Sequence, residues 1–378
     1  MCKQNPMTDK TSPLAPRSSS LRDRVARWVR PEIRVLSAYH VPNASGLIKL
    51  DAMENPYSWP AEMVQQWLET LRQVELNRYP DPSARALKDR LRQAMAVPED
   101  ADILLGNGSD EIIQMLLLAL AAPGQTVVSV EPGFVMYHMI ATFAGMNYVG
   151  VPLQDDFALD KDALLAAIEE HQPAIVFLAY PNNPTGNLFS ASEIEAIIRA
   201  TPGVVIVDEA YHAFADDSFM PKVMSYDNLL VMRTVSKMGL AGLRLGLLAG
   251  PAAWLDEFEK VRLPYNINVL TQASAEFALQ HADVLQAQTE QIKKDRTMLE
   301  QALRQIDGLT VYPSRANFIL FRVPAGQAEL VFEGLKSKDV LVKNLDKAAG
   351  VLKDCIRVTV GTPEENTAFI TALTQVLT

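Results

Sequence analysis

A lysine that follows an apolar run is the first candidate for chemistry. Lys237 ends the segment Thr234-Val235-Ser236-Lys237, and small or apolar residues surround it. A buried ammonium without a partner is unfavourable unless its pKa falls or its nitrogen forms a covalent bond. A Schiff base with an aldehyde would remove that cost. The alternative is a lysine whose charge reaches water from a loop, so the neighbouring motifs must decide.

A carboxylate at the end of another apolar run is the second candidate. Asp208 follows residues 204–207, and Tyr211 comes three residues later. In α/β sheets ligands bind beyond the carboxyl ends of the strands, so Asp208 is expected beside a cofactor. Its alternative role is to cap the next turn. Nucleotide hydrolases also end a strand in Asp, but the chain lacks their G-x-x-x-x-G-K-[ST] phosphate loop.

A turn sequence after a third apolar run adds polar groups to the same region. Residues 182–186 read Asn-Asn-Pro-Thr-Gly. Pro and Gly fix the turn, and an Asn side chain such as that of Asn183 can hold a phenolic oxygen of a ligand ring. An ordinary turn is the alternative. Its position before Asp208 and Lys237 in the chain favours the functional interpretation.

A glycine-containing turn between a strand and an apolar helix predicts a phosphate site. Residues 106–108 read Gly-Asn-Gly, which lets backbone amides approach an anion at a helix N-terminus. We assign the contact to the amides of Ser109 and Asp110, and expect the Asp110 carboxylate to turn away as a cap. A purely structural turn is the alternative. Two hydroxyls and a guanidinium would complete the site: Thr234, Ser236 and Arg244.

Together these motifs match pyridoxal 5′-phosphate. Their order, Gly-Ser-Asp-Glu, Asn-Asn-Pro-Thr-Gly, Asp-Glu-Ala-Tyr and Ser-Lys-x-Gly-Leu-Ala-Gly-Leu-Arg, resembles a fold-type I, class I/II aminotransferase over nearly everything after Arg30. The resemblance implies that Lys237 bonds the cofactor and that Asp208 holds its pyridine nitrogen. It also implies that Asn183 and Tyr211 hold the ring hydroxyl.

Four further segments resemble the histidinol-phosphate aminotransferases, a family of histidine biosynthesis: residues 36–39, 50–57, 77–81 and 355–362. The resemblance implies ping-pong transamination of L-histidinol phosphate with 2-oxoglutarate, giving imidazole-acetol phosphate and glutamate. Lys237 would act as general base and acid. The alternatives are an aromatic or broad-specificity aminotransferase, a phosphothreonine decarboxylase, and a catalytically silent cofactor-binding regulatory protein. Retention of Lys237, Asp208, Tyr211 and Arg244 argues against the last.

The same resemblance implies two aromatic contacts to the cofactor. Tyr137 would stack on the ring, although a core aromatic on a helix is the alternative. Tyr57 would cross a homodimer interface to the phosphate of the other subunit, although it could be a packing residue.

Four residues are implied in substrate binding. Arg357 would bind the carboxylate of glutamate or the phosphate of histidinol phosphate, and a surface charge is the alternative. Asn317 and Lys343 would lie near it, and Tyr39 would add a phosphate contact. Lys343 stands where many members carry Arg, so it offers a point charge instead of a bidentate fork.

Composition narrows the class of protein. The chain has 378 residues, 48% hydrophobic and 21% charged, and a formal net charge of −10 without a long basic stripe. It therefore lacks the electrostatic character of a nucleic-acid binder. Two cysteines, far apart, form neither a disulfide framework nor a metal site and fit the cytoplasm. No apolar run reaches the roughly 20 residues of a membrane helix, and no secretory signal is evident.

The sequence pattern around these residues predicts an α/β fold. Apolar runs alternate with helical patterns from about residue 101 to 250, which predicts a mostly parallel central sheet flanked by helices. We expect strands at 102–105, 126–130, 174–178, 204–207, 229–234 and 245–249, helices at 111–121, 134–144, 161–171 and 191–200, and a capping box from Ser190 to Glu193.

The C-terminal part reads as a smaller α+β domain. Helices are expected over residues 271–305, and strands at 309–312, 317–322, 340–343 and 355–360. The predicted organisation is a flexible tail (1–20), an N-terminal segment packing on the small domain and the dimer partner (21–60), a large cofactor-binding domain (61–265) and a small domain (266–378).

Overall fold

The computed structural model describes residues 21–38, 41–348 and 350–377, and the chain divides into two compact units, Met1–Pro42 and Asn43–Thr378. The described part of the first unit holds two short helices, α1 (Leu21–Trp28) and α2 (Pro31–Arg34), and neither buries a residue. The predicted tail 1–20 and the predicted substrate contact Tyr39 lie outside the described residues.

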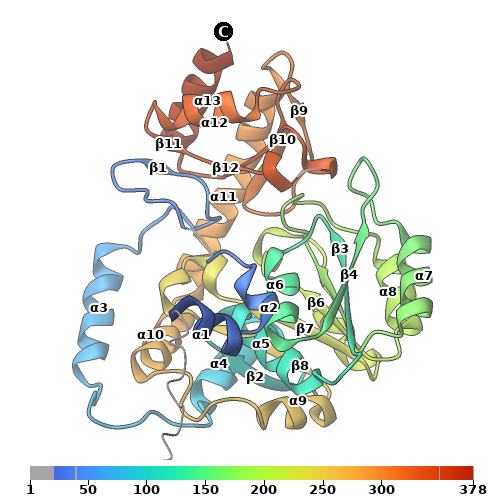
Figure 1. Ribbon diagram of the computed structural model, residues 1–378. Helices are drawn as coiled ribbons and strands as arrows, with labels where there is room; N and C mark the ends of the chain where they lie inside the picture. The colour runs from blue at the N-terminus through green and yellow to red at the C-terminus, as the bar shows by residue number, and fades with distance from the viewer. Residues whose placement is uncertain (1–20, 39–40, 349, 378) are drawn as a thin grey trace, which may run out of the picture. The chain divides into compact units, whose positions relative to one another are not determined.

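A seven-stranded sheet is the centre of the second unit (Figure 1). Its order is β2-β8-β7-β6-β5-β3-β4, and every pair is parallel except the two that β8 makes. Every position of β5, β6 and β7 is buried, which explains their continuous apolar sequences. The bounds are β2 (Asp102–Gly106), β3 (Thr126–Glu131), β4 (Asn147–Pro152), β5 (Ile175–Ala179), β6 (Val204–Asp208), β7 (Leu229–Thr234) and β8 (Gly246–Gly250).

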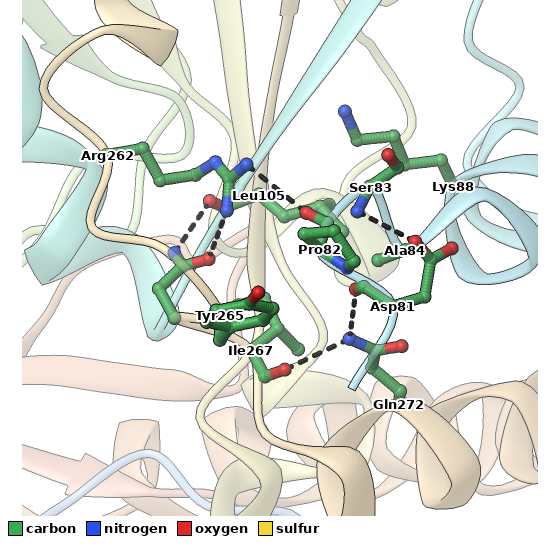
Figure 2. A pocket seen from close by; sticks show the side chains of 11 residues that line it. Asp81, Pro82, Ser83, Ala84, Lys88, Leu105, Arg262, Tyr265, Ile267 and Gln272 are labelled. Atoms are coloured by element: carbon green, nitrogen blue, oxygen red, sulfur yellow. Dashed lines mark hydrogen bonds between the residues drawn. The ribbon is translucent and has the colours of Figure 1, made fainter. Parts of the chain in front are cut away.

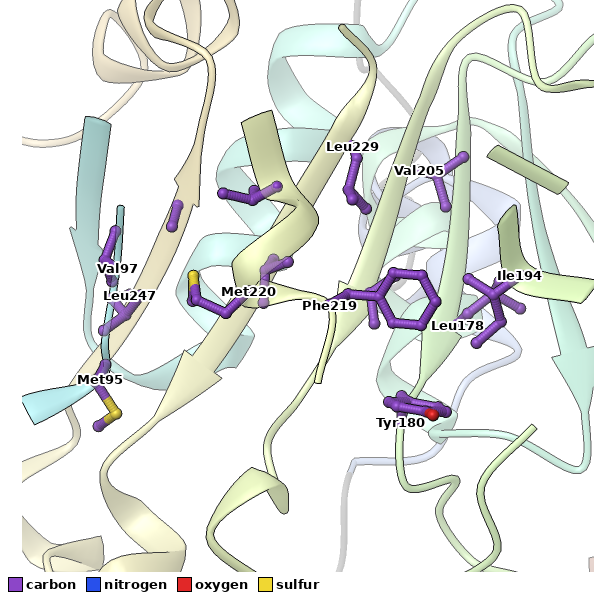
Figure 3. Packing of buried hydrophobic residues seen from close by; sticks show 14 of the residues in the cluster. Met95, Val97, Leu178, Tyr180, Ile194, Val205, Phe219, Met220, Leu229 and Leu247 are labelled. Carbon is purple, nitrogen blue, oxygen red and sulfur yellow. The ribbon is translucent and has the colours of Figure 1, made fainter. Parts of the chain in front are cut away.

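Helices cover both faces of this sheet because successive strand residues point to opposite sides. One face packs on α5 (Gly108–Leu120), α6 (Val135–Ala144) and α9 (Ala252–Glu259). The other packs on α4 (Arg85–Ala94), α7 (Lys161–His171), α8 (Ala191–Ala200) and α10 (Val269–Gln280). Figure 3 shows Leu178 and Val205 of neighbouring strands in this second core, with Ile194 of α8 and Phe219.

A second, four-stranded antiparallel sheet has the order β12-β13-β10-β9. Its strands are β9 (Thr310–Val311), β10 (Phe318–Arg322), β12 (Lys343–Asn344) and β13 (Cys355–Thr359), and its core includes residues of α11 (Ala282–Arg304), α12 (Ala328–Lys336) and α13 (Pro363–Leu377). Two further short strands, β1 (Ile48–Lys49) and β11 (Val340–Leu341), pair in parallel. The register sets Lys343 opposite Arg357.

Short connecting elements complete the second unit. Helix α3 (Ala61–Arg72) precedes α4. Two 3₁₀ helices follow β6, η1 (His212–Phe214) and η2 (Met220–Ser225), and two follow β7, η3 (Ser236–Met238) and η4 (Ala241–Leu243). The last two are η5 (Asp346–Ala348) and η6 (Gly350–Leu352).

The predicted fold class, a mostly parallel α/β sheet flanked by helices with a smaller α+β part, is confirmed. Strand β4 was not predicted, because its sequence Asn-Tyr-Val-Gly-Val-Pro contains three residue types that strands disfavour. The predicted capping box is wrong: the Ser190 hydroxyl bonds to Ser192, and no side chain caps α8. The domain boundaries at residues 60 and 265 stay predictions.

Within the ranges that the structure describes, no helix is both long and apolar enough to cross a bilayer.

Candidate active site

A cavity of about 400 Å³ lies where β5, β6 and β7 end and α5 begins. This is the edge of a parallel sheet at which ligands bind. Nine of the residues predicted from the sequence line it: Ser109, Asp110, Asn183, Asp208, Tyr211, Thr234, Ser236, Lys237 and Arg244. Motifs spread over more than a hundred residues therefore meet in one place.

Lys237 lies in η3, just after β7, with its amine in the cavity wall. Its Nζ lies 5.8 Å from the centroid of the Tyr211 ring and donates a 3.4 Å hydrogen bond to the carbonyl of Ala52. Burial, and then the charge of Arg357, lowers the pKa of Lys237 to about 8. The amine is thus closer to its neutral, nucleophilic form at neutral pH than a surface lysine would be.

Asp208 is the last residue of β6 and is almost fully buried. Its Oδ1 accepts from the Ala210 amide (3.1 Å) and its Oδ2 from the Tyr137 hydroxyl (2.6 Å). Burial raises the pKa of Asp208 to about 6, and the Tyr137 hydrogen bond opposes that rise. A carboxylate held in this way can pair with a cationic ring nitrogen in the cavity.

Asn183 lies at the cavity and hydrogen-bonds both Tyr211, which follows β6, and Arg357, which lies in β13 of the second sheet. Its Nδ2 donates to the Tyr211 hydroxyl (3.1 Å), and its Oδ1 accepts from Nη1 of Arg357 (2.6 Å). Nη2 of Arg357 donates to the carbonyl of Asp51 (3.0 Å), and the guanidinium lies over Phe318. Strand β13 therefore brings Arg357 beside the cavity, although the side chain does not line it.

The N-terminus of α5 lies at the cavity, where the sequence predicts an anion site. Ser109 and Asp110 lie in its first turn, where backbone amides have no helical partner. Arg244 faces this turn, and an added Cβ on Gly108 would lie only 2.7 Å from its Nη2. The Thr234 hydroxyl donates to Ser236 Oγ at 2.8 Å, which sets both hydroxyls at the cavity wall.

The prediction that the Asp110 carboxylate caps the helix is wrong. It forms an ion pair with Arg244 instead, at 3.3 Å. The carboxylate that serves the helix start is Glu111, which accepts from the Asn107 amide at 2.6 Å. Asp110 therefore holds the guanidinium that a phosphate would share.

Tyr137 does not line the cavity, so the predicted stacking contact is wrong. Its ring is buried behind Asp208 and stacks on Phe177 at a centroid distance of 4.5 Å. Phe134, the residue before α6, lines the cavity in its place. The Pro-Gly pair before Phe134 was the available signal, because it ends the turn that carries β3 to the helix.

Tyr57 also lies outside the cavity lining. Its hydroxyl donates to Oδ2 of Asp295 in α11 at 2.6 Å, and burial raises the pKa of Tyr57 above its ordinary value. That bond occupies the hydroxyl proton within its own chain. A contact with the phosphate of a second subunit stays a prediction.

Two further residues that are predicted to bind substrate, Asn317 and Lys343, lie outside the cavity lining. Asn317 Nδ2 donates to the carbonyl of Met53 at 2.9 Å, and Met53 lines the cavity. Lys343 is half-buried opposite Arg357 in the second sheet. Sequence reasoning assigned no role to the lining segment 52–54, whose Met53 amide donates to Thr359 Oγ1. The family resemblance of residues 50–57 was the available signal.

A second pocket, in Figure 2, is a weaker candidate. Its cavity of about 10 Å³ has room for one water at most. Gln272 Nε2 donates to the carbonyls of Asp81 and Ile267, and Arg262 Nη2 donates to that of Pro82. These polar groups satisfy one another and hold loops together. Among the described residues no cluster of His, Cys, Asp or Glu could hold a metal.

The large cavity fits a phosphorylated pyridine aldehyde on the properties of its own residues. It offers an amine of lowered pKa, a buried carboxylate, hydrogen-bonded Asn and Tyr side chains, and a helix N-terminus beside an arginine. Gly108, at φ +77°, leaves the space that Arg244 occupies. Such a set can bind an anion, form a covalent bond to an aldehyde and move a proton.

Comparisons with known proteins agree on the family. The model of the family "Aminotransferase class I and II" matches residues 45–373. The histidinol-phosphate aminotransferase 2 of Nitrosococcus oceani is 62% identical over 352 residues, which cover 93% of this chain and 98% of that protein. The histidinol-phosphate aminotransferase 1 of Ralstonia nicotianae is 54% identical, over 95% of this chain and 96% of that protein.

Solved structures share the fold. The histidinol-phosphate aminotransferase from Sinorhizobium meliloti, in complex with pyridoxal-5′-phosphate, superposes with a TM-score of 0.83 at 24% identity, covering 93% of this chain and 97% of that chain. The L-threonine-O-3-phosphate decarboxylase from Porphyromonas gingivalis reaches 0.75 at 22% identity, covering 87% and 99%. The fold is therefore compatible with more than one reaction.

Proposed function

The chain belongs to the class I and II aminotransferase family, and from that premise we propose that it transfers the amino group of L-histidinol phosphate to 2-oxoglutarate. The products are imidazole-acetol phosphate and glutamate, and the reaction is a step of histidine biosynthesis. The observation that carries the proposal is the meeting of Lys237, Asp208 and Asn183 at one cavity, with Arg357 held beside it by Asn183. The chain is similar to histidinol-phosphate aminotransferases over nearly its whole length.

Pyridoxal 5′-phosphate is the cofactor of this family, and when bound it takes up the amino group and accepts the electron pair that proton removal leaves. We assign Lys237 to its aldehyde carbon, Asp208 to its ring nitrogen, and Asn183 with Tyr211 to its ring hydroxyl. The phosphate belongs at the start of α5, with the amides of Ser109 and Asp110. The other phosphate contacts are the side chains of Thr234, Ser236 and Arg244.

Lys237 is the proposed proton carrier. Once substrate displaces it from the cofactor, its amine is free to take the α-proton and to return it. A pKa of about 8 suits both directions near neutral pH. Tyr211 lies beneath this amine, and its hydroxyl is fixed by Asn183.

Arg357 is the proposed anion site for the substrates. It is held by Asn183 and the Asp51 carbonyl, so its guanidinium has a fixed direction. Phosphate and carboxylate would bind there in turn, since donor and acceptor use one site. Lys343 lies opposite Arg357 in register and would add a second positive charge.

We further propose a cytoplasmic homodimer. Tyr79 and Tyr265 stack at 4.4 Å although they are 80% and 40% exposed, and Leu76 and Leu263, near them in sequence, are each 71% exposed. An exposed apolar group of this kind supports a partner surface. Sedimentation of the full chain should give twice its monomer mass; a monomer that is fully active would contradict the dimer.

The half-reaction tests the donor directly. Mixing the cofactor-loaded protein with histidinol phosphate alone should consume the visible absorption of the lysine-bound cofactor, and histidinol without phosphate should do so at least about tenfold more slowly. Lys237→Ala should lack that absorption from the start. Release of carbon dioxide from phosphothreonine, with no amino transfer, would replace the proposal by the decarboxylase alternative.

A further inference from the structure

Asp208 has both carboxylate oxygens engaged, but by bonds of different origin. Oδ1 accepts from the amide of Ala210, within the turn that follows β6. Oδ2 accepts at 2.6 Å from the hydroxyl of Tyr137, which comes from α6 and lies 71 residues earlier in the chain. Only the second bond depends on a side chain, so a single substitution can remove it and leave the turn intact.

Packing fixes the Tyr137 ring independently of this hydrogen bond. It is 1% exposed, stacks on Phe177 of β5 with planes 10° apart, and meets Phe134 edge to face. Strand β5 is hydrogen-bonded to β6, which carries Asp208. Packing against the sheet therefore fixes the position of the hydroxyl, at a site that excludes water.

A phenol has a chemical advantage at this position. Burial, and then the charge of Asp208, raises the pKa of the Tyr137 hydroxyl well above its ordinary value. The hydroxyl therefore stays protonated and always donates. It also carries no positive charge, so it supports the carboxylate without competing with a cationic ring nitrogen for it.

We propose that Tyr137 is a positioning residue that keeps Asp208 ionised and aimed at the ring nitrogen of the bound cofactor. Its hydroxyl, and not the face of its ring, serves the reaction, while Phe134 is the residue of segment 134–137 that lines the cavity. The inference rests on the cofactor of the proposed function but not on the identity of the amino donor.

The charges around the pair explain why such support is needed. Asp110 of α5 and Glu209, the next residue of the chain, both raise the pKa of Asp208 as like charges, in addition to burial. Tyr137 and the Ala210 amide act in the opposite direction. On the other side, Tyr211 and Tyr148 raise the pKa of Tyr137 itself. Loss of the hydroxyl would therefore leave Asp208 in surroundings that favour its neutral form.

The test uses the full-length protein loaded with cofactor that carries ¹⁵N in its ring, whose NMR resonance reports protonation of that nitrogen. Tyr137→Phe keeps the ring and removes the hydroxyl. We expect the ratio of nitrogen-bound to Asp208-bound proton to fall about tenfold relative to the unmodified protein, because a carboxylate that has lost its donor takes the shared proton more readily.

Tyr180→Phe is the matched control. Tyr180 is also 1% exposed and donates to a carboxylate, Oδ2 of Asp217 at 2.8 Å, but neither residue lines the cavity. That variant should leave the nitrogen unchanged. An unchanged nitrogen in Tyr137→Phe, or an equal change in Tyr180→Phe, overturns the inference. If Tyr137→Phe does not fold, 3-fluorotyrosine at position 137 keeps the shape, donates more strongly, and should raise the nitrogen-bound fraction of the proton.

A second measurement needs no cofactor. The infrared carbonyl band of protonated Asp208, identified by its loss in Asp208→Asn, should titrate near pH 6 in the unmodified chain and at higher pH in Tyr137→Phe. An unmoved band contradicts the role of Tyr137 even if the donor assignment is right. Failure of the full chain to bind pyridoxal phosphate, with the band moving as expected, contradicts the proposed function instead.

Discussion

At the scale of single residues, burial acts on the two central ionisable groups in opposite directions. It raises the pKa of Asp208 to about 6 and lowers that of Lys237 to about 8. Both changes favour the neutral form, as desolvation requires. The carboxylate stays ionised at neutral pH because Tyr137 and Ala210 hold it, whereas the amine is left near the point where it can be either base or acid.

The rate at which Lys237 reacts with the cofactor should depend on pH. Only the neutral amine attacks an aldehyde, so the rate at which visible absorption grows after pyridoxal phosphate is added should rise with pH and level off above about 8. Stopped-flow absorbance from pH 6 to 10 measures it. A rate that keeps rising to pH 10 would show an ordinary lysine and contradict this assignment.

Arg357→Gln tests the charge that lowers the pKa of Lys237 from outside the cavity. Removing the guanidinium should shift the same rate profile to higher pH, because Arg357 is the largest cause after burial. It should also raise the KM for glutamate at least about tenfold, since a charged hydrogen bond is lost. Arg315→Gln, an exposed arginine paired with Asp216, is the control and should change neither quantity.

At the scale of elements, the turn into α5 decides how the phosphate is held. Gly108→Ala would set a Cβ 2.7 Å from Arg244 Nη2 at a φ of +77°, so the guanidinium must move. We expect cofactor affinity to fall about tenfold or more, as when a charged contact is lost. Equilibrium titration of the full chain with pyridoxal phosphate measures this loss.

Gly124→Ala separates strain from displacement. Gly124 has a similar φ, +84°, but an added Cβ there meets nothing within 4 Å. Both variants should lose comparable thermal stability, and only Gly108→Ala should lose affinity. Equal affinities in the two variants would mean that Arg244 does not hold the phosphate.

The strands and the cavity residues also show which features can be predicted from local sequence patterns. The apolar runs and the motif order predicted six strands of the central sheet and nine of the cavity residues, because strand ends and turn chemistry are local properties. Which aromatic of residues 134–137 faces the ligand is not local. It depends on where α6 begins and how it packs on β5, and the prediction of Tyr137 in place of Phe134 failed there.

The edge strand β4 and the ion pair of Asp110 were not predicted for the same reason, because both depend on residues far away in the sequence. β4 pairs only with β3, at the edge of the sheet, and needs little strand propensity of its own. The Asp110 carboxylate could cap its helix or pair with Arg244, and the choice rests on a residue 134 positions later in the chain. No pattern within a window of ten residues carries that information.

At the scale of the whole molecule, the half-buried histidine that follows Tyr211 couples acidity to stability. Burial, and then the charge of Arg233, lowers the pKa of His212 to about 3, against about 6.5 in an unfolded chain. The unfolded chain therefore binds a proton that the folded protein does not. The stability that His212 contributes is complete above about pH 6.5 and is lost as the pH falls toward 3.

His212→Asn should flatten this dependence. Thermal unfolding of the full chain between pH 7 and 5 should show a smaller fall in Tm for the variant than for the unmodified protein. His171→Asn, at the half-exposed end of α7, is the control and should keep the original slope. Parallel slopes for His212→Asn and the unmodified protein would show that the His212 ring is not the source.

The steady-state rate of amino transfer to 2-oxoglutarate from two donors, histidinol phosphate and phenylalanine, distinguishes the proposed substrate from the aromatic alternative. We predict that kcat/KM for histidinol phosphate is higher by at least about 100-fold, because only that donor carries a phosphate whose nearly double charge matches Arg357 and Lys343 together, whereas phenylalanine offers a single carboxylate charge. Glutamate and imidazole-acetol phosphate should form in equal amounts. A preference for phenylalanine, or equal rates with both donors, would contradict it.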